Sequence, residues 1–124
     1  MISYDHLDKY TIKEIFSEEQ NKNHTQVLCP LDLKPWFLGL GIPEHQVTEC
    51  DWWDDLEVTR LPETLDPSDE VSLKETLASP AHRKIIISAV PAQHFSGRTG
   101  FDFNKTLWAG WVVKSQDASY YFAG

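Results

Sequence analysis

The sequence has no long apolar run, and its N-terminus has no apolar segment. No apolar stretch approaches the roughly 20 residues that a membrane-spanning helix needs. The first ten residues, MISYDHLDKY, carry charges where a signal peptide would have its apolar core. These absences predict an intracellular protein that is soluble or associated with a membrane only peripherally.

Basic residues are few: 11 lysines and arginines face 19 aspartates and glutamates, for a net charge of −8. No basic cluster exceeds two neighbouring residues, which argues against a nucleic acid as partner. A neutral or cationic small molecule suits this balance. An anionic substrate would need a metal ion or a local basic pocket to offset the field.

Cysteine is also scarce, because Cys29 and Cys50 are the only two. Two cysteines are too few for a disulfide framework, so each is expected to be a buried thiol, with a single bridge as the alternative. Together with His24 and His45 they form an H-x4-C…H-x4-C pattern. Structural zinc sites usually hold their ligands at closer spacing, which argues against zinc at these four residues.

Apolar periodicity predicts alternating helices and strands. A helix is expected within residues 5–22, with Asp8 or Thr11 as its N-cap, and a short helix within 32–42, where Pro35 lies in the first turn. The strand of residues 83–92 is a continuous apolar run, which predicts burial on both faces. Further strands are expected within 25–31, 45–50, 51–61, 105–115 and 118–124. This order indicates a layered α/β domain.

Residues 62–82 differ from the rest, with three prolines, many charges and no apolar periodicity. They are expected to form an excursion from a single domain, with one helical turn at Leu73–Leu77. Of the five tryptophans, Trp52 and Trp53 stand among aspartates, which disfavours an anionic membrane surface. Core packing is the expected role of most tryptophans.

Two places in the sequence offer chemistry. Asp5 and His6 precede the first helix and supply a carboxylate and an imidazole, both ordinary zinc ligands, although an Asp at a helix start is usually a cap. His94 opens a glycine-containing loop after the strand of 83–92, where α/β folds mount active sites. Its position alone fits a ligand and a structural histidine equally well.

Several motifs together resemble one family. They are ISYDHLD, PLDLKPWFLGLGI, VTECDWWDD, VPAQHFSGRTGFDFNKTLWAGWVV and YYFAG, in this order. The series resembles the metallo-β-lactamase-fold hydrolases of the N-acylphosphatidylethanolamine-hydrolysing phospholipase D group. The resemblance covers most of the chain, and residues 62–82 match least.

The resemblance implies an αβ/βα sandwich with a mixed sheet, flanking helices and two metal ions, usually zinc. Asp5 and His6 match the end of the family motif H-x-H-x-D-H and would bind the second metal, with Asp5 also the candidate catalytic residue. His94 matches the histidine after PAQ and would bind the first metal. A metal-bound hydroxide would then attack a phospholipid phosphodiester.

The sequence also departs from the family. The two leading histidines of the motif are absent, as is the aspartate of the family's later D-T-G. Residues 1–124 are therefore expected to form a single incomplete metallo-β-lactamase-like domain, inactive by itself and prone to self-association through open sheet edges. Two alternatives remain: a non-catalytic interaction domain, or another hydrolase of this fold such as a lactonase.

Overall fold

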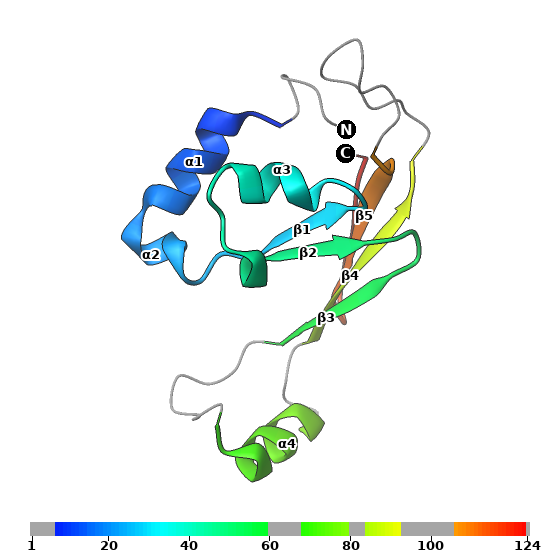
Figure 1. Cartoon of the computed structure of the whole chain (residues 1–124). Helices are drawn as coiled ribbons and strands as arrows, with labels where there is room; N and C mark the ends of the chain where they lie inside the picture. Colours follow the sequence, from blue (N-terminus) through cyan, green and yellow to red (C-terminus); the bar gives the residue numbers. More distant parts are fainter. Residues whose placement is uncertain (1–6, 60–67, 80–83, 93–105, 124) are drawn as a thin grey trace.

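The architecture consists of two sheets with helices packed beside the smaller one (Figure 1). A computed structural model describes residues 7–59, 68–79, 84–92 and 106–123. The helices are α1 (Lys9–Ser17), α2 (Glu19–Lys22), α3 (Lys34–Gly39), the 3-10 turn η1 (Glu44–Gln46) and α4 (Glu70–Ala78). The strands are β1 (Val27–Pro30), β2 (Val47–Cys50), β3 (Asp55–Thr59), β4 (Lys84–Pro91), β5 (Ala109–Lys114) and β6 (Ser119–Phe122).

The smaller sheet is a parallel pair, β1 and β2, connected through α3 and η1. Parallel strands need such a crossover, and Pro35 in the first turn favours the start of α3. The backbone N–H of Lys34 donates to Glu49 Oε1 at 3.0 Å, which ties the start of α3 to β2. Gly41, with φ of 90°, then turns the chain towards η1, a conformation that glycine adopts without a Cβ penalty.

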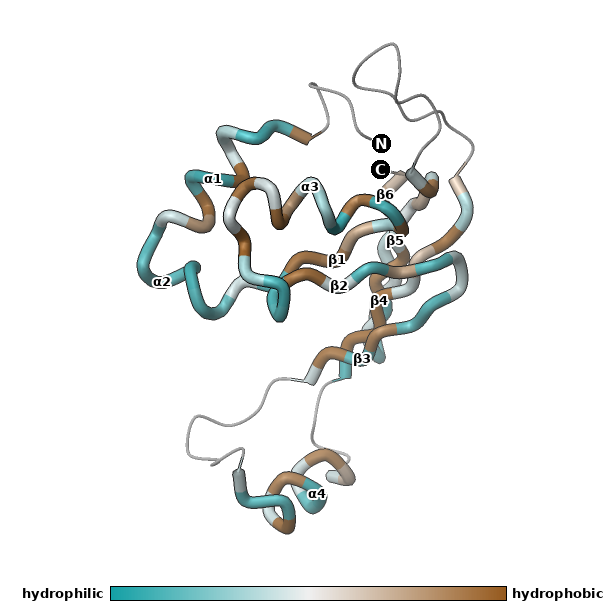
Figure 2. The backbone as a smooth tube through the Cα atoms, viewed as in Figure 1, coloured by the Kyte–Doolittle hydropathy of each residue, from teal (hydrophilic) through white to brown (hydrophobic). Residues whose placement is uncertain are grey.

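The principal core lies between this pair and α3. Phe37 of α3 is 4% exposed and packs with Leu33, Ile42, Cys29 and Val47. Two apolar side chains of α1, Ile12 and Phe16, pack against this cluster, and Figure 2 shows hydrophobic and hydrophilic residues alternating along the helix. The helix predicted within 5–22 is present, but Glu18, in an extended conformation, divides it into α1 and α2. Of the two candidate N-caps, Asp8 takes the position, accepting a hydrogen bond from the backbone N–H of Thr11.

The larger sheet is antiparallel, in the order β3-β4-β5-β6. Because directly paired residues share a face, one face carries Asp55, Ser88 and Val112, and the other carries Ile87, Ala89 and other apolar side chains. The predicted strand of 83–92 is confirmed as β4, but its predicted burial on both faces is wrong. Ile85 and Ile86 are 38% and 37% exposed, because the described part of the chain places no helix layer over either residue.

Helix α4 falls in the predicted excursion and is longer than the single turn expected at Leu73–Leu77. Asp69 caps it by accepting from the backbone N–H groups of Val71 and Ser72. A hydrogen bond from the Ser72 hydroxyl lowers the pKa of the Asp69 carboxyl below its usual value. No residue of α4 is buried, so capping rather than apolar periodicity specifies this helix.

Candidate metal centre

The three predicted ligands, Asp5, His6 and His94, lie outside the described residues. Residues close to them in the sequence are described. Leu7 directly follows His6, and Ala92 is two residues before His94. The contacts of these residues show where the chain enters or leaves the described part of the fold.

These neighbours attach around the end of β1 and the start of α3. Leu7 packs against the core cluster beneath α3. The backbone N–H of Leu107, which follows the His94 segment, donates to the carbonyl of Leu31 at 3.2 Å, one residue after β1. The N–H of Ala92 donates to Trp108 at 3.4 Å. The beginning of α1 and the end of β4 accordingly lie at the same edge of the molecule (Figure 1).

Residues 51–54, DWWD, form the turn that joins β2 of the smaller sheet to β3 of the larger one. Asp54 Oδ2 accepts from the N–H of Asp51 at 2.8 Å, and Asp51 Oδ1 accepts from the N–H of Trp52 at 2.7 Å. The Trp52 indole N–H donates to the carbonyl of Trp108 at 2.6 Å. Trp52 thus anchors the segment that follows the His94 loop. The sequence predicts no such contact for Trp52, and its available signal is the pair of Asp residues that flank the two tryptophans.

Trp53, the next residue, has an unusual conformation. Its φ is 73°, in the left-handed region, where a bulky residue costs roughly 1–2 kcal/mol. A 2.7 Å hydrogen bond from its N–H to the carbonyl of Ala89 holds it there. Its side chain is 72% exposed, so core packing, the role expected of most tryptophans, is wrong for this one.

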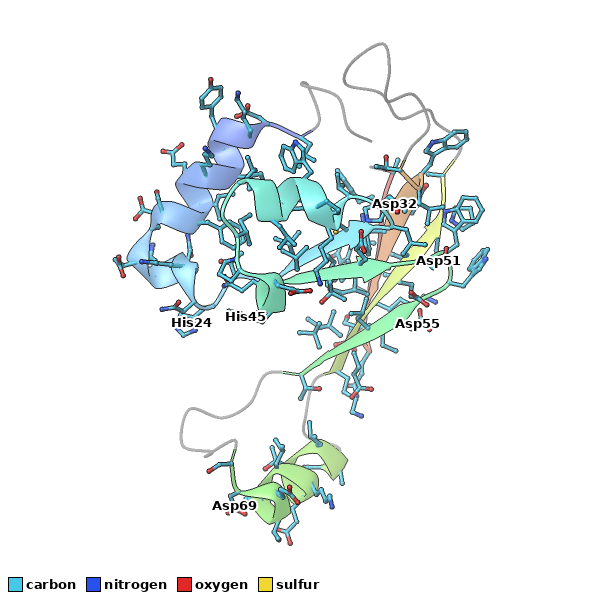
Figure 3. The ribbon with its side chains drawn as sticks, in the orientation of Figure 1. His24, Asp32, His45, Asp51, Asp55 and Asp69 are labelled. Atoms are coloured by element: carbon cyan, nitrogen blue, oxygen red, sulfur yellow. The ribbon has the colours of Figure 1, made fainter. Side chains whose placement is uncertain are left out.

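The alternative zinc pattern of His24, Cys29, His45 and Cys50 is not assembled. Both histidines are exposed and both cysteines are buried. His24 and His45 lie at the opposite end of the small sheet from Asp32 and Asp51 (Figure 3). Across residues 7–59, 68–79, 84–92 and 106–123, no three His, Cys, Asp or Glu side chains gather into a group that could hold a metal. The structure thus keeps these four residues from forming one cluster, with both histidines at the surface and both cysteines buried.

The cysteines are separate buried thiols, as predicted. Cys29 pairs in register with Glu49, and Pro30 pairs with Cys50, so the two side chains point to opposite faces of the β1–β2 sheet. Burial, followed by the negative charge of Glu49, raises the pKa of the Cys29 thiol from 9.0 to about 12. Burial also raises the pKa of Cys50.

We expect Cys29 to resist alkylation by iodoacetamide in the native protein at pH 8, since the thiolate is the reactive form. Because the folded pKa exceeds the unfolded one, the stability contributed by neutral Cys29 is complete below pH 9.0 and is lost as the pH rises towards about 12. Mass spectrometry of the alkylated protein, with a urea-unfolded sample as control, measures this protection. Equal labelling of native and unfolded protein would contradict it.

Comparison with known proteins identifies the family. Residues 2–124 match the family described as the beta-lactamase superfamily domain. The chain belongs to this superfamily. The resemblance inferred from the motifs is confirmed, and so is the fold class: helices with parallel and antiparallel sheets, consistent with part of an αβ/βα sandwich.

Individual relatives sharpen the comparison within the superfamily. The chain is 31% identical, over 98% of its length, to N-acyl-phosphatidylethanolamine-hydrolyzing phospholipase D 1 of Caenorhabditis elegans. It is 25% identical, over 91% of its length, to the mitochondrial protein of the same activity name in Saccharomyces cerevisiae, and 28% identical, over 98%, to an uncharacterized protein of Mycobacterium tuberculosis. The chain spans 28%, 19% and 25% of these three proteins, respectively.

Two further findings concern metal ions and membranes. Members of the metallo-β-lactamase superfamily generally bind metal ions. One carboxylate and two imidazoles, as Asp5, His6 and His94 supply, are a donor set that suits zinc. Among the helices that the structure describes, none is long and apolar enough to cross a membrane.

Proposed function

We propose that this chain forms part of a zinc-dependent phosphodiesterase that hydrolyses a phospholipid, with an N-acylphosphatidylethanolamine as substrate. The observation that carries the proposal is the match of almost the whole chain to the C. elegans phospholipase D at 31% identity. The yeast relative carries the same activity in its name. The family match covers residues 2–124 and therefore spans both segments that contain the candidate ligands.

The proposed ligands are Asp5 and His6 for one ion and His94 for the other. The fold supports this assignment, because Leu107, after the His94 segment, bonds to Leu31, and Leu7, after Asp5 and His6, packs against the core cluster that includes Leu33. Asp8, three residues after Asp5, caps α1 and fixes its start at Lys9. The N–H of Ala92 and the indole of Trp52 both bond to the Trp108 carbonyl and so hold the two ends of the His94 segment.

When bound, zinc would lower the pKa of a water molecule and polarise a phosphoryl oxygen. The contribution of the chain is to hold and orient the ions through one carboxylate and two imidazoles. A net charge of −8 opposes an approaching phosphodiester, so local positive charge at this edge is needed to bind it. This electrostatic requirement fits a metal centre better than a site built from the few basic residues.

We also propose that these 124 residues do not hydrolyse the substrate by themselves. Three candidate ligands divided between two ions leave both short of the three protein ligands usual for catalytic zinc. A second candidate role, as an interaction domain, is favoured by one observation. All four residues of the edge strand β6 are exposed, with Tyr120, Tyr121 and Phe122 at 71%, 61% and 68%.

The experiment is a chimera in which residues 4–124 replace the corresponding segment of the C. elegans phospholipase D, so that the host keeps its own residues at the positions of the two leading motif histidines, which this sequence lacks. We expect the chimera to hydrolyse N-acylphosphatidylethanolamine in a zinc-dependent manner. His94→Ala in the chimera should remove about one zinc equivalent. Its activity should fall by more than the 10- to 100-fold typical for residues that only hydrogen-bond to ligands.

His24→Ala is the matched control, because His24 is exposed and lies away from the candidate edge. It should leave zinc content and activity unchanged. Zinc content by elemental analysis and product release by mass spectrometry are the two measurements, with circular dichroism confirming the fold of each variant. Unchanged zinc in the His94→Ala chimera would refute its role as a ligand. Turnover by the 124-residue chain alone would refute the proposed inactivity.

A further inference from the structure

The outward face of the larger sheet contains a trough of about 340 Å³. This volume lies within the range of small-molecule sites, roughly 300–1,000 Å³. The pairing register places its central residues side by side, with Ser88 of β4 between Asp55 of β3 and Val112 of β5. The residues that line the trough are Trp53, Asp55, Ile86, Ser88, Val90, Val112 and Lys114.

Trp53 lines the trough, and a contribution to stability does not explain its backbone conformation or its exposure. Its backbone is in a region that bulky residues avoid, and 72% of its surface is exposed. A left-handed residue with an exposed side chain would be more stable as glycine or asparagine. An outlier of this kind at a cavity is the pattern expected where an aromatic surface serves a ligand.

Two opposite charges line the trough, one on each side of β4. Asp55 lies on β3 (Figure 3), two residues after Trp53, and Lys114 lies on β5. Among the described residues neither makes an ion pair. The neighbouring Glu57 and Lys84 do pair with each other, at 2.8 Å. Asp55 and Lys114 are thus available to a ligand, and the apolar floor of Ile86, Val90 and Val112 separates them.

Gly110 of β5 lies on the same face of the sheet as the trough, because it pairs with Val90. Tyr121 leans over this residue so closely that a Cβ at position 110 would lie 2.8 Å from its ring. The same face therefore has an aromatic side chain on β6 as well as Trp53 beside β3.

We propose that the trough binds a small free zwitterion. Its ammonium group lies on the face of Trp53 beside the Asp55 carboxylate, and its anionic group lies towards Lys114. A cation over an indole next to a carboxylate is favoured by the ring quadrupole and by charge, and the short carbon linker covers the apolar floor. The site differs from the proposed metal centre in its residues, so it does not rest on the phosphodiesterase activity.

The test is a titration of the 124-residue chain with phosphocholine at low salt, followed by the NMR signals of Trp53, Asp55 and Lys114. We expect phosphocholine to bind at least tenfold more tightly than tetramethylammonium or inorganic phosphate. Trp53→Gly and Asp55→Asn should each weaken binding about tenfold. Lys114→Gln should reduce phosphocholine to the affinity of tetramethylammonium.

Two controls separate this role from a structural one. Trp53→Gly should lose binding while its Tm stays unchanged or rises, because glycine accommodates the positive φ. Glu14→Gln on α1 repeats the charge change of Asp55→Asn at an exposed site and should leave binding unchanged. A large fall in Tm for Trp53→Gly would assign Trp53 to stability and overturn the proposal.

Other results would also overturn it. These are no binding of phosphocholine, equal binding by the Trp53→Gly variant, or shifts confined to residues outside the trough. Sedimentation with phosphatidylcholine vesicles provides the last arm. Vesicle binding that depends on Trp53, without binding of free phosphocholine, would mean a lipid surface in place of a free zwitterion.

Discussion

Phe37→Ala is expected to destabilise the chain by about 3–5 kcal/mol, the usual cost of removing a buried phenyl ring. Phe37 is 4% exposed and contacts Trp36 edge-on, with ring centroids 5.0 Å apart and planes at 87°. It is also the link between α3 and the β1–β2 pair. A domain has only about 5–15 kcal/mol in total, so the variant should retain little folded protein at 37 °C.

Leu38→Ala is the matched control for this prediction. Leu38 is the next residue of the same helix and is 38% exposed, so its truncation should cost far less than that of Phe37. Urea denaturation monitored by circular dichroism measures both free energies of unfolding. Equal losses for the two variants would show that the cluster around Phe37 is not the principal core.

The second large effect is expected at Gln46, which is 1% exposed at the end of η1. Its amide Nε2 donates to the carbonyls of Lys22 at 2.8 Å and Thr25 at 3.0 Å, and so joins η1 to the chain entering β1. Its Oε1 has no partner within the described residues. Gln46→Glu replaces the donor by a carboxylate facing two carbonyl oxygens, and should cost about 3–5 kcal/mol at pH 7.

The pH dependence of this variant tests the electrostatic cause. Burial raises the folded pKa of the introduced carboxyl above its unfolded value of about 4.3. The protonated form is therefore the stabilising one, and its contribution is complete below about pH 4.3 and is lost as the pH rises through the folded pKa. The stability difference from the wild type should shrink between pH 7 and pH 4.

Gln46→Leu is the control without charge. It removes the two hydrogen bonds to the carbonyls of Lys22 and Thr25, which should cost about 1–3 kcal/mol. The stability difference between this variant and the wild type should be the same at pH 7 and pH 4. Urea denaturation of the three proteins at both pH values provides the comparison. A Gln46→Glu variant whose loss is independent of pH would contradict a buried, ionised carboxylate.

The sequence predicted the secondary structure well where local signals exist. Pro35 marked the first turn of α3, and short apolar runs ended by proline or polar residues marked β1 and β2. The burial of β4 was predicted wrongly, since a continuous apolar run is typical of a parallel strand between two layers. β4 pairs antiparallel on both sides, and Ile85 and Ile86 are partly exposed. Apolar composition does not reveal which neighbouring layer covers a strand.

The candidate ligands came from motif resemblance, and superfamily membership confirms the family from which they were inferred. Their roles stay predictions. By contrast, the trough could not be predicted, because it depends on pairing between residues far apart in the chain. Asp55 lies opposite Ser88, and Ser88 lies opposite Val112, only because of the pairing register of β3, β4 and β5.

The sequence by itself determined the superfamily, the order of helices and strands, and the residues offered as ligands, since these depend on local patterns and motifs. Only the tertiary structure decided that the two cysteines point to opposite faces of one sheet and that Trp53 projects outward. It also decided that Leu107 bonds to Leu31 and that Leu7 packs against the core cluster. The physical reason is that sheet register and crossover connections determine which residues come together and on which face each side chain lies. Neither is encoded in local residue spacing.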